Sequence, residues 1–100
     1  MSYSDEDLRR IWAKGKIVSA DNLWRKDVCD AFMYWPHYGN RNSEYGWEVD
    51  HIVPIARGGG EDLSNLRPLH WENNASRQDG KLVCAVKSNG QHNVHIYSRR

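Results

Sequence analysis

The sequence has little net charge, few cysteines and no long apolar run. Without about 20 consecutive apolar residues, no segment can span a membrane as a helix, so we expect no membrane partner. A net charge of +1 does not by itself indicate a nucleic-acid-binding protein, because such proteins are usually more basic. The chain starts with polar and acidic residues, which is not typical of a secretion signal, so we expect a cytoplasmic protein.

The two cysteines, Cys29 and Cys84, are too few for a disulfide framework and too far apart for a zinc knuckle. A cytoplasmic location would keep both of them reduced. Free cysteine behaves as a small apolar residue. We therefore expect two reduced and partly buried thiols.

Positive charge is distributed unevenly along the chain. Residues 67–100 hold six Lys or Arg and two Asp or Glu. Residues 1–50 hold seven Lys or Arg and nine Asp or Glu. If the protein has a basic surface, this distribution places it on the C-terminal side.

Large aromatic rings are abundant: the 100 residues include five Trp and five Tyr, but a single Phe. A chain of this length allows one domain, so we expect residues 1–100 to fold as a unit. Small domains bury a modest share of their surface, and large rings bury much area per residue. The core is therefore expected to be aromatic.

The N-terminal part predicts a helix. Ser4 can cap it, three acidic residues follow at the positive end of the helix dipole, and Leu8, Ile11 and Trp12 form one apolar face. Residues 21–33 favour a helical turn or two, although their aspartates are also typical of loops.

Two other regions lie outside the central segment. Residues 33–43 carry proline, glycine and asparagine and predict a surface loop. Near the end of the chain, residues 82–86 and 94–97 predict two strands of a β-hairpin that turns at Asn89-Gly90.

The central segment, residues 47–77, holds most of the polar residues suited to chemistry. The alternation of apolar and polar residues over 47–51 predicts a short strand, which Pro54 ends. Three glycines, residues 58–60, indicate a flexible loop, and residues 66–69 predict the return strand.

A helix is expected from His70, with Asn74 in its first or second turn. Asp50, at the end of the first strand, is a hard oxygen ligand, and Asn74 offers a carbonyl oxygen. This combination suits Mg²⁺ or Mn²⁺. His51 titrates near neutrality and could accept a proton from an attacking water.

The segment resembles the HNH endonucleases. The resemblance rests on Asp50-His51-Ile52-Val53-Pro54, Gly58-Gly59, Asn65-Leu66 and Asn74, with 14 positions from His51 to Asn65 and 9 from Asn65 to Asn74. It implies an α+β fold with a ββα-metal (His-Me finger) core, to which an N-terminal helix and a C-terminal β-hairpin are added. It also implies metal-dependent hydrolysis of DNA, with one strand nicked per active site.

The resemblance assigns roles to four residues. His51 is the general base, and Asn65 fixes the loop while its backbone carbonyl orients the His51 ring. Asp50 and Asn74 hold one divalent ion, with Mg²⁺ or Mn²⁺ first and Ni²⁺, Co²⁺ or Zn²⁺ as alternatives. Many members also bind a structural zinc through four cysteines. Here His70 and Asn73 stand where one pair would be, so no structural zinc is expected, and Asn73 is interpreted as structural.

Further residues are candidates for substrate binding: Arg41, His70, Arg77 and Gln78. His70 and Gln78 would lie one helical turn before and after Asn74, and Arg77 could meet a phosphate. For these three, a solvated helix face is an equal alternative. Glu48 shares its strand face with Asp50 and is expected to pair with an arginine such as Arg41.

The expected partner is DNA, bound weakly and mainly through its phosphate backbone. Two other functions stay open. One is a non-catalytic nucleic-acid-binding module with the same fold, and the other is a nuclease subunit that acts only inside a phage packaging assembly. The sequence leaves the oligomeric state undecided.

Overall fold

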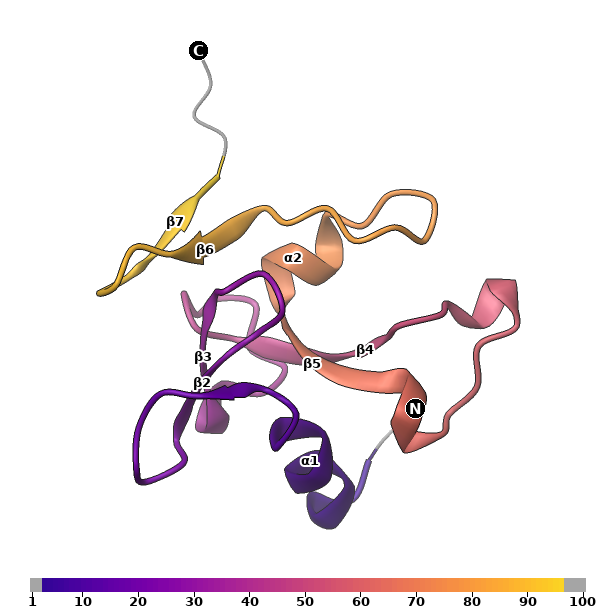
Figure 1. The fold of residues 1–100 in the computed structure, drawn as a ribbon, viewed down its shortest axis with the longest axis horizontal. Helices are drawn as coiled ribbons and strands as arrows, with labels where there is room; N and C mark the ends of the chain where they lie inside the picture. The colour runs from indigo at the N-terminus through magenta and orange to yellow at the C-terminus, as the bar shows by residue number, and fades with distance from the viewer. Residues whose placement is uncertain (1–2, 97–100) are drawn as a thin grey trace.

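The structure, a computed structural model, describes residues 3–96 and shows a small α+β arrangement (Figure 1). The helices and strands in chain order are α1 (Asp5–Trp12), β1 (Lys16–Ile17), β2 (Trp24–Lys26), β3 (Phe32–Tyr34), β4 (Trp47–His51), β5 (Leu66–His70), α2 (Trp71–Ala75), β6 (Val86–Ser88) and β7 (Asn93–His95). Within the described residues the strands form the antiparallel sheets β1–β2–β3, β4–β5 and β6–β7. Over the same residues, no helix combines the length and apolar character needed to cross a membrane.

Helix α1 confirms the prediction for the N-terminal part. The Ser4 hydroxyl accepts a hydrogen bond from the backbone N–H of Asp7 at 3.0 Å, which satisfies one of the unpaired donors of the first turn. Leu8, Ile11 and Trp12 are buried on the face that the sequence indicates. The helix stops at Trp12, and Gly15 follows in a turn that leads into β1.

The expectation of helical turns over residues 21–33 is wrong. Strands β2 and β3 form an antiparallel hairpin instead, and the ring of Trp24 stacks on that of Tyr34 with centroids 4.6 Å apart. The Asp27 carboxylate closes the turn, because it accepts hydrogen bonds from the backbone N–H groups of Cys29 and Ala31. Cross-strand aromatic packing and this Asp turn outweigh the weak local helix propensity.

The surface loop predicted over residues 33–43 begins later than expected. Residues 32–34 belong to β3, and a short 3-10 helix (Trp35–His37) follows before the chain enters a loop. The first part of this region is held by packing, because Met33 is fully buried.

The core is aromatic, as the composition predicts. The Trp12 and Trp47 rings lie 4.8 Å apart between centroids, and Trp35 packs on both at 5.6 Å. Leu8 and Met33 complete this cluster, which joins α1, β3 and β4. Each aromatic pair of this kind stabilises the fold by about 0.5–1.5 kcal/mol, in addition to the effect of burying its apolar area.

Strands β4 and β5 pair over their full length and lead directly into α2, so the predicted order of strand, loop, strand and helix is confirmed. The pairing sets Asp50 opposite Arg67 and His51 opposite Leu66. The intervening loop folds tightly onto β4. A Cβ atom at Gly59 would collide with the backbone carbonyl of Val53, so only glycine fits at that position.

The C-terminal hairpin is confirmed, with shorter strands than predicted. Strands β6 and β7 pair around the turn at residues 89–92, whereas residues 82–85 are not part of a strand. The predicted end of the second strand at Tyr97 lies outside the described residues. Asn73 of α2 holds the hairpin, because its side-chain oxygen accepts hydrogen bonds from the backbone N–H groups of Ala85 and Val86.

A disulfide joins Cys29 to Cys84, with their Cα atoms 5.7 Å apart, so the expectation of two reduced thiols is wrong. The cysteines are 55 positions apart, and the fold brings the β2–β3 turn next to the segment that precedes β6. The bridge thereby fastens the C-terminal hairpin to the N-terminal half of the domain.

Breaking this disulfide is expected to lower the free energy of unfolding by about 2–4 kcal/mol, because the bond closes a long loop in the unfolded chain. Denaturant unfolding of the wild type with and without a thiol reductant measures the loss. The double variant Cys29→Ala/Cys84→Ala is the control and should not respond to the reductant. An equal response of both proteins would mean that the reductant acts elsewhere.

Candidate active site

A cleft of about 350 Å³ opens where the end of β4 meets α2. Polar lining comes from β4, from α2 and from the chain just beyond it: Asp50, His51, Asn74 and Arg77. A neighbouring hollow of about 500 Å³ shares Val49, His51 and Ile55 with this cleft and extends to Glu61. His51 therefore lines both hollows, and the structure brings it together with Asp50 and Asn74 as the sequence predicts.

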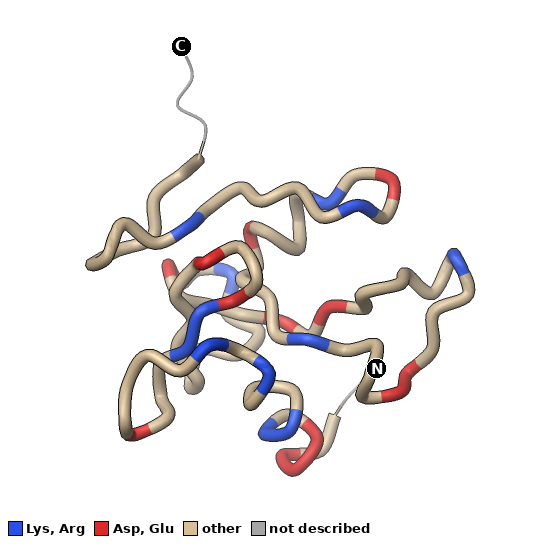
Figure 2. Tube along the Cα trace, viewed as in Figure 1, with Lys and Arg blue, Asp and Glu red and all other residues tan. Residues whose placement is uncertain are grey.

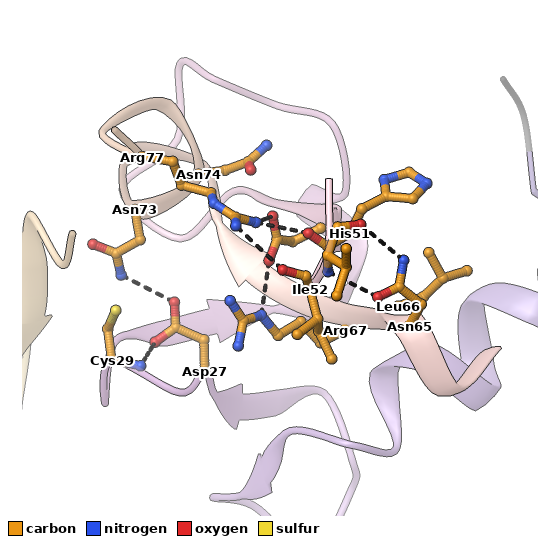
Figure 3. Close-up of polar contacts among 12 residues, drawn as sticks. Asp27, Cys29, His51, Ile52, Asn65, Leu66, Arg67, Asn73, Asn74 and Arg77 are labelled. Carbon is orange, nitrogen blue, oxygen red and sulfur yellow. Dashed lines mark hydrogen bonds and ion pairs between the residues drawn. The ribbon is translucent and has the colours of Figure 1, made fainter. Parts of the chain in front are cut away.

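Asp50 is buried, with 3% of its surface exposed, and its carboxylate forms ion pairs with two arginines. Arg67 Nε donates to Oδ2 at 2.7 Å, and Arg77 Nη1 donates to Oδ1 at 2.5 Å. Arg67 lies directly opposite Asp50 in the β4–β5 pairing, and Arg77 comes from the turn after α2 (Figure 3). The negative charge of the Asp50 carboxylate is thus shared by two positively charged guanidinium groups.

The expected contact of Arg77 with a phosphate stays a prediction, and the structure shows its guanidinium bonded within the chain. Besides Asp50, its guanidinium donates to the backbone carbonyls of His51 at 2.7 Å, of Ile52 at 3.3 Å and of Gly80. Helix α2 ends at Ala75, so Arg77 leaves the helix face on which the sequence places it. It fastens the segment after α2 to the end of β4.

His70 does not line the cleft. Its side chain is fully buried, Nδ1 accepts the backbone N–H of Glu72 at 3.0 Å, and Nε2 bonds to the carbonyl oxygen of Glu44 at 2.6 Å. His70 caps the start of α2. Gln78 is exposed and lies beyond the helix, where its backbone pairs with Lys81, and its role in substrate binding stays a prediction.

His51 and Asp50 are neighbours on β4, where successive side chains point to opposite sides, and they bond to different partners. His51 Nε2 lies 2.9 Å from Glu61 Oε2, and Tyr3 donates its hydroxyl to Glu61 Oε1 at 3.0 Å. The bond with His51 lowers the pKa of Glu61, and burial together with Glu61 raises the pKa of Tyr3 to about 12. Glu61 follows the glycines of the loop, ten positions after His51, and sequence periodicity gave no indication of this contact.

Asn65 closes the loop between β4 and β5. Its side chain bonds to both backbone groups of Val53, at 2.8 and 3.0 Å, and to the carbonyl of Gly60 at 2.9 Å. Its own backbone carbonyl accepts the N–H of Ile52 at 2.8 Å. The expectation that this carbonyl orients the His51 ring is therefore not met, and Glu61 holds the ring in its place.

Asn74 lies at the end of a short hydrogen-bonded chain. Its Nδ2 donates to Glu48 Oε1 at 2.8 Å, and Arg41 binds both carboxylate oxygens of Glu48, at 2.5 and 2.8 Å. The predicted pair of Glu48 and Arg41 is thus confirmed, and a substrate contact by Arg41 stays a prediction. Burial raises the pKa of Glu48, but the bonds from Arg41 and Asn74 outweigh it and hold this pKa below its ordinary value.

Asn73, by contrast, is structural, as predicted. It is fully buried, and its Nδ2 donates to Asp27 Oδ2 at 3.0 Å. The same oxygen accepts the backbone N–H of His70 at 3.0 Å. Asp27 therefore ties the start of α2 to the β2–β3 turn.

The residues present fit a hard divalent cation. Residues 3–96 contain no group of three or more His, Cys, Asp or Glu that could hold a metal ion, and the side-chain oxygens on the cleft are those of Asp50 and Asn74. Asn74 Oδ1 accepts no hydrogen bond within the described part of the chain, because the amide nitrogen is the atom that faces Glu48. A carboxylate has about four lone-pair sites, so Asp50 keeps acceptor capacity beside its two arginines. Oxygen donors of this kind suit Mg²⁺ or Mn²⁺.

A comparison with protein families decides the class of this site. Residues 38–79 match the family model described as HNH endonuclease. This segment is similar to HNH endonuclease domains. The HNH segment contains β4, β5 and α2, with Asp50, His51, Asn65 and Asn74 among its residues. Searches of curated proteins and of solved structures give no match.

The match points to a general class of activity. The similarity of residues 38–79 to HNH endonucleases indicates nuclease activity in general. The residues that line the cleft at the end of β4 are the part of the HNH segment with groups suited to that chemistry.

Proposed function

We propose that this protein is a divalent-metal-dependent HNH endonuclease that hydrolyses DNA phosphodiester bonds and nicks one strand per active site. The observation that carries the proposal is one cleft, within the matched segment, that Asp50, His51 and Asn74 line together. In this proposal β4, β5 and α2 form the ββα-metal core.

His51 is proposed to accept the proton of the attacking water. It is partly exposed and lines two hollows, so water and a phosphate can reach it. Its bond to Glu61 holds the ring, and a proton on Nε2 leaves the lone pair of Nδ1 free to act as a base. The hydrogen bond from Tyr3 fixes Glu61 in turn.

Asp50 and Asn74 are the proposed ligands of the cation. When bound, a divalent cation supplies charge neutralisation at the phosphate and stabilises the leaving oxygen. Arg67 and Arg77 hold the Asp50 carboxylate in place. The chain from Arg41 through Glu48 orients the Asn74 amide, so that its nitrogen is engaged and its oxygen stays available.

A test of this function starts with supercoiled plasmid and Mg²⁺ or Mn²⁺, with Ni²⁺, Co²⁺ and Zn²⁺ in parallel. We expect open-circular DNA to appear before linear DNA, because one site with one base cuts one strand. Gel analysis of a time course gives the order of products. Addition of EDTA is the control and should stop the reaction. Linear product at the earliest times and at low enzyme concentration would instead indicate paired sites in a dimer.

A further inference from the structure

Four basic side chains line another cavity, of about 360 Å³, next to the β4–β5 pair: Lys14, Lys16, Lys26 and Arg67. We call it the basic cavity. Three of the four come from the N-terminal half, so this basic site is not confined to the C-terminal side, where the sequence placed a basic surface. The distribution of charge along the chain could not show this, because the turn after α1 meets β1, β2 and β5 only in the folded domain, where Figure 2 shows basic positions on neighbouring segments.

Acidic residues neutralise the basic cavity only in part. Asp27 is the one acidic residue of the lining and keeps its negative charge, because its partners in the β2–β3 turn and in α2 are neutral N–H groups; the lining holds four basic side chains against it. Lys26 has one exposed partner, Asp30, at 3.3 Å. Lys14 donates to backbone carbonyls, including that of Leu66 at 2.7 Å, and neutral acceptors leave its charge in place.

Lys16 and Arg67 supply the donors that are still available. Lys16 is exposed and forms no ion pair with any described residue. Arg67 uses Nε for Asp50, and neither of its terminal nitrogens has an acceptor within residues 3–96. In Figure 3 these two nitrogens extend away from the bond that Nε makes. Such a pair of N–H groups matches two oxygens of one phosphate.

The basic cavity lies beside the HNH site. Ile52, the residue after His51, lines the basic cavity. Arg67 connects the cavity to the HNH site, because it lines the cavity and its Nε bonds to Asp50. A nucleic acid strand seated at His51 would therefore pass close to these cations. Carboxylates and other small anions lack a chain of regularly spaced charges, so they could not bind at the HNH site and in the basic cavity at once.

We propose that the basic cavity binds a backbone phosphate of the nucleic acid, next to the phosphodiester that is cut. The proposal rests on the nuclease function proposed above and adds a positioning contact to it. Arg67 donates its terminal N–H groups to the phosphate, and Lys16 and Lys26 add charge. The bound phosphate and Asp50 are then held by one guanidinium.

The test compares two double variants that remove the same charge. Lys16→Gln/Lys26→Gln alters the basic cavity, and Lys81→Gln/Lys87→Gln alters two exposed lysines outside its lining. Affinity for a short DNA duplex is measured by fluorescence anisotropy over a range of salt concentrations, in EDTA so that no cleavage occurs. For the cavity variant, the slope of log K against log salt should become shallower by about 0.9 for each phosphate that the protein no longer neutralises. The control should keep a slope close to that of the wild type.

Thermal unfolding of both variants checks that each is folded. Equal slopes and affinities for the two double variants would overturn the phosphate site, even if the wild-type protein nicks plasmid. A selective decrease in the cavity variant would support the site. If the wild type fails to nick plasmid while that selective decrease persists, the nuclease function is wrong but the phosphate site is retained.

Discussion

Replacing His51 with alanine is expected to lower the rate of DNA cleavage by about 10²–10⁴-fold, the usual contribution of a positioned general base. The fold should be unaffected, because the His51 side chain is bonded to Glu61 at the rim of the cleft and is not part of the aromatic core. Metal and DNA affinities should stay near wild type, because in the proposed mechanism His51 acts on water. Single-turnover cleavage, calorimetric metal titration and DNA anisotropy measure the three quantities.

The matched control for this variant is His92→Ala, which removes an exposed histidine in the turn of the C-terminal hairpin. It should cleave at the wild-type rate. Cleavage by His51→Ala within a few-fold of wild type would show that His51 is not the base. Loss of metal affinity in His51→Ala would instead make His51 a ligand, and the proposed roles would have to be exchanged.

Asp50→Ala should lower the free energy of unfolding by about 3–5 kcal/mol, the cost of breaking a buried ion pair. Removal of this carboxylate leaves Arg67 and Arg77, whose side chains are 19% and 12% exposed, without their acidic partner. A small domain is stable by only about 5–15 kcal/mol, so much of its stability would disappear. Denaturant unfolding followed by tryptophan fluorescence measures the effect.

Because of this structural role, Asp50→Ala does not test metal binding by itself. Asp50→Asn keeps the shape and one oxygen acceptor but removes the charge, and Asn74→Ala removes a side chain bonded only to Glu48 within residues 3–96. Both should be more stable than Asp50→Ala, bind the metal weakly and lose most cleavage. Wild-type metal affinity in both would contradict the ligand assignment. An unchanged unfolding midpoint for Asp50→Ala would show that the arginine pairs add no stability.

The elements that local patterns determine were predicted from the sequence. Helix α1 follows from a cap and an apolar face, and the order of β4, β5 and α2 follows from alternation and glycine and proline positions. The pairing of Glu48 with Arg41 follows from strand alternation and charge. The β2–β3 hairpin was missed, because its strands are short and depend on partners across the turn.

The sequence by itself identified Asp50, His51 and Asn74 as candidate site residues in one segment, and the structure places them on one cleft. Only the tertiary structure decided what surrounds them. Arg67 faces Asp50 through strand register, and Glu61 reaches His51 because the glycine loop folds back. The basic cavity and the disulfide likewise join segments distant in the chain. Periodicity reports only neighbours within one helix or strand, whereas contacts between segments depend on how the whole domain packs.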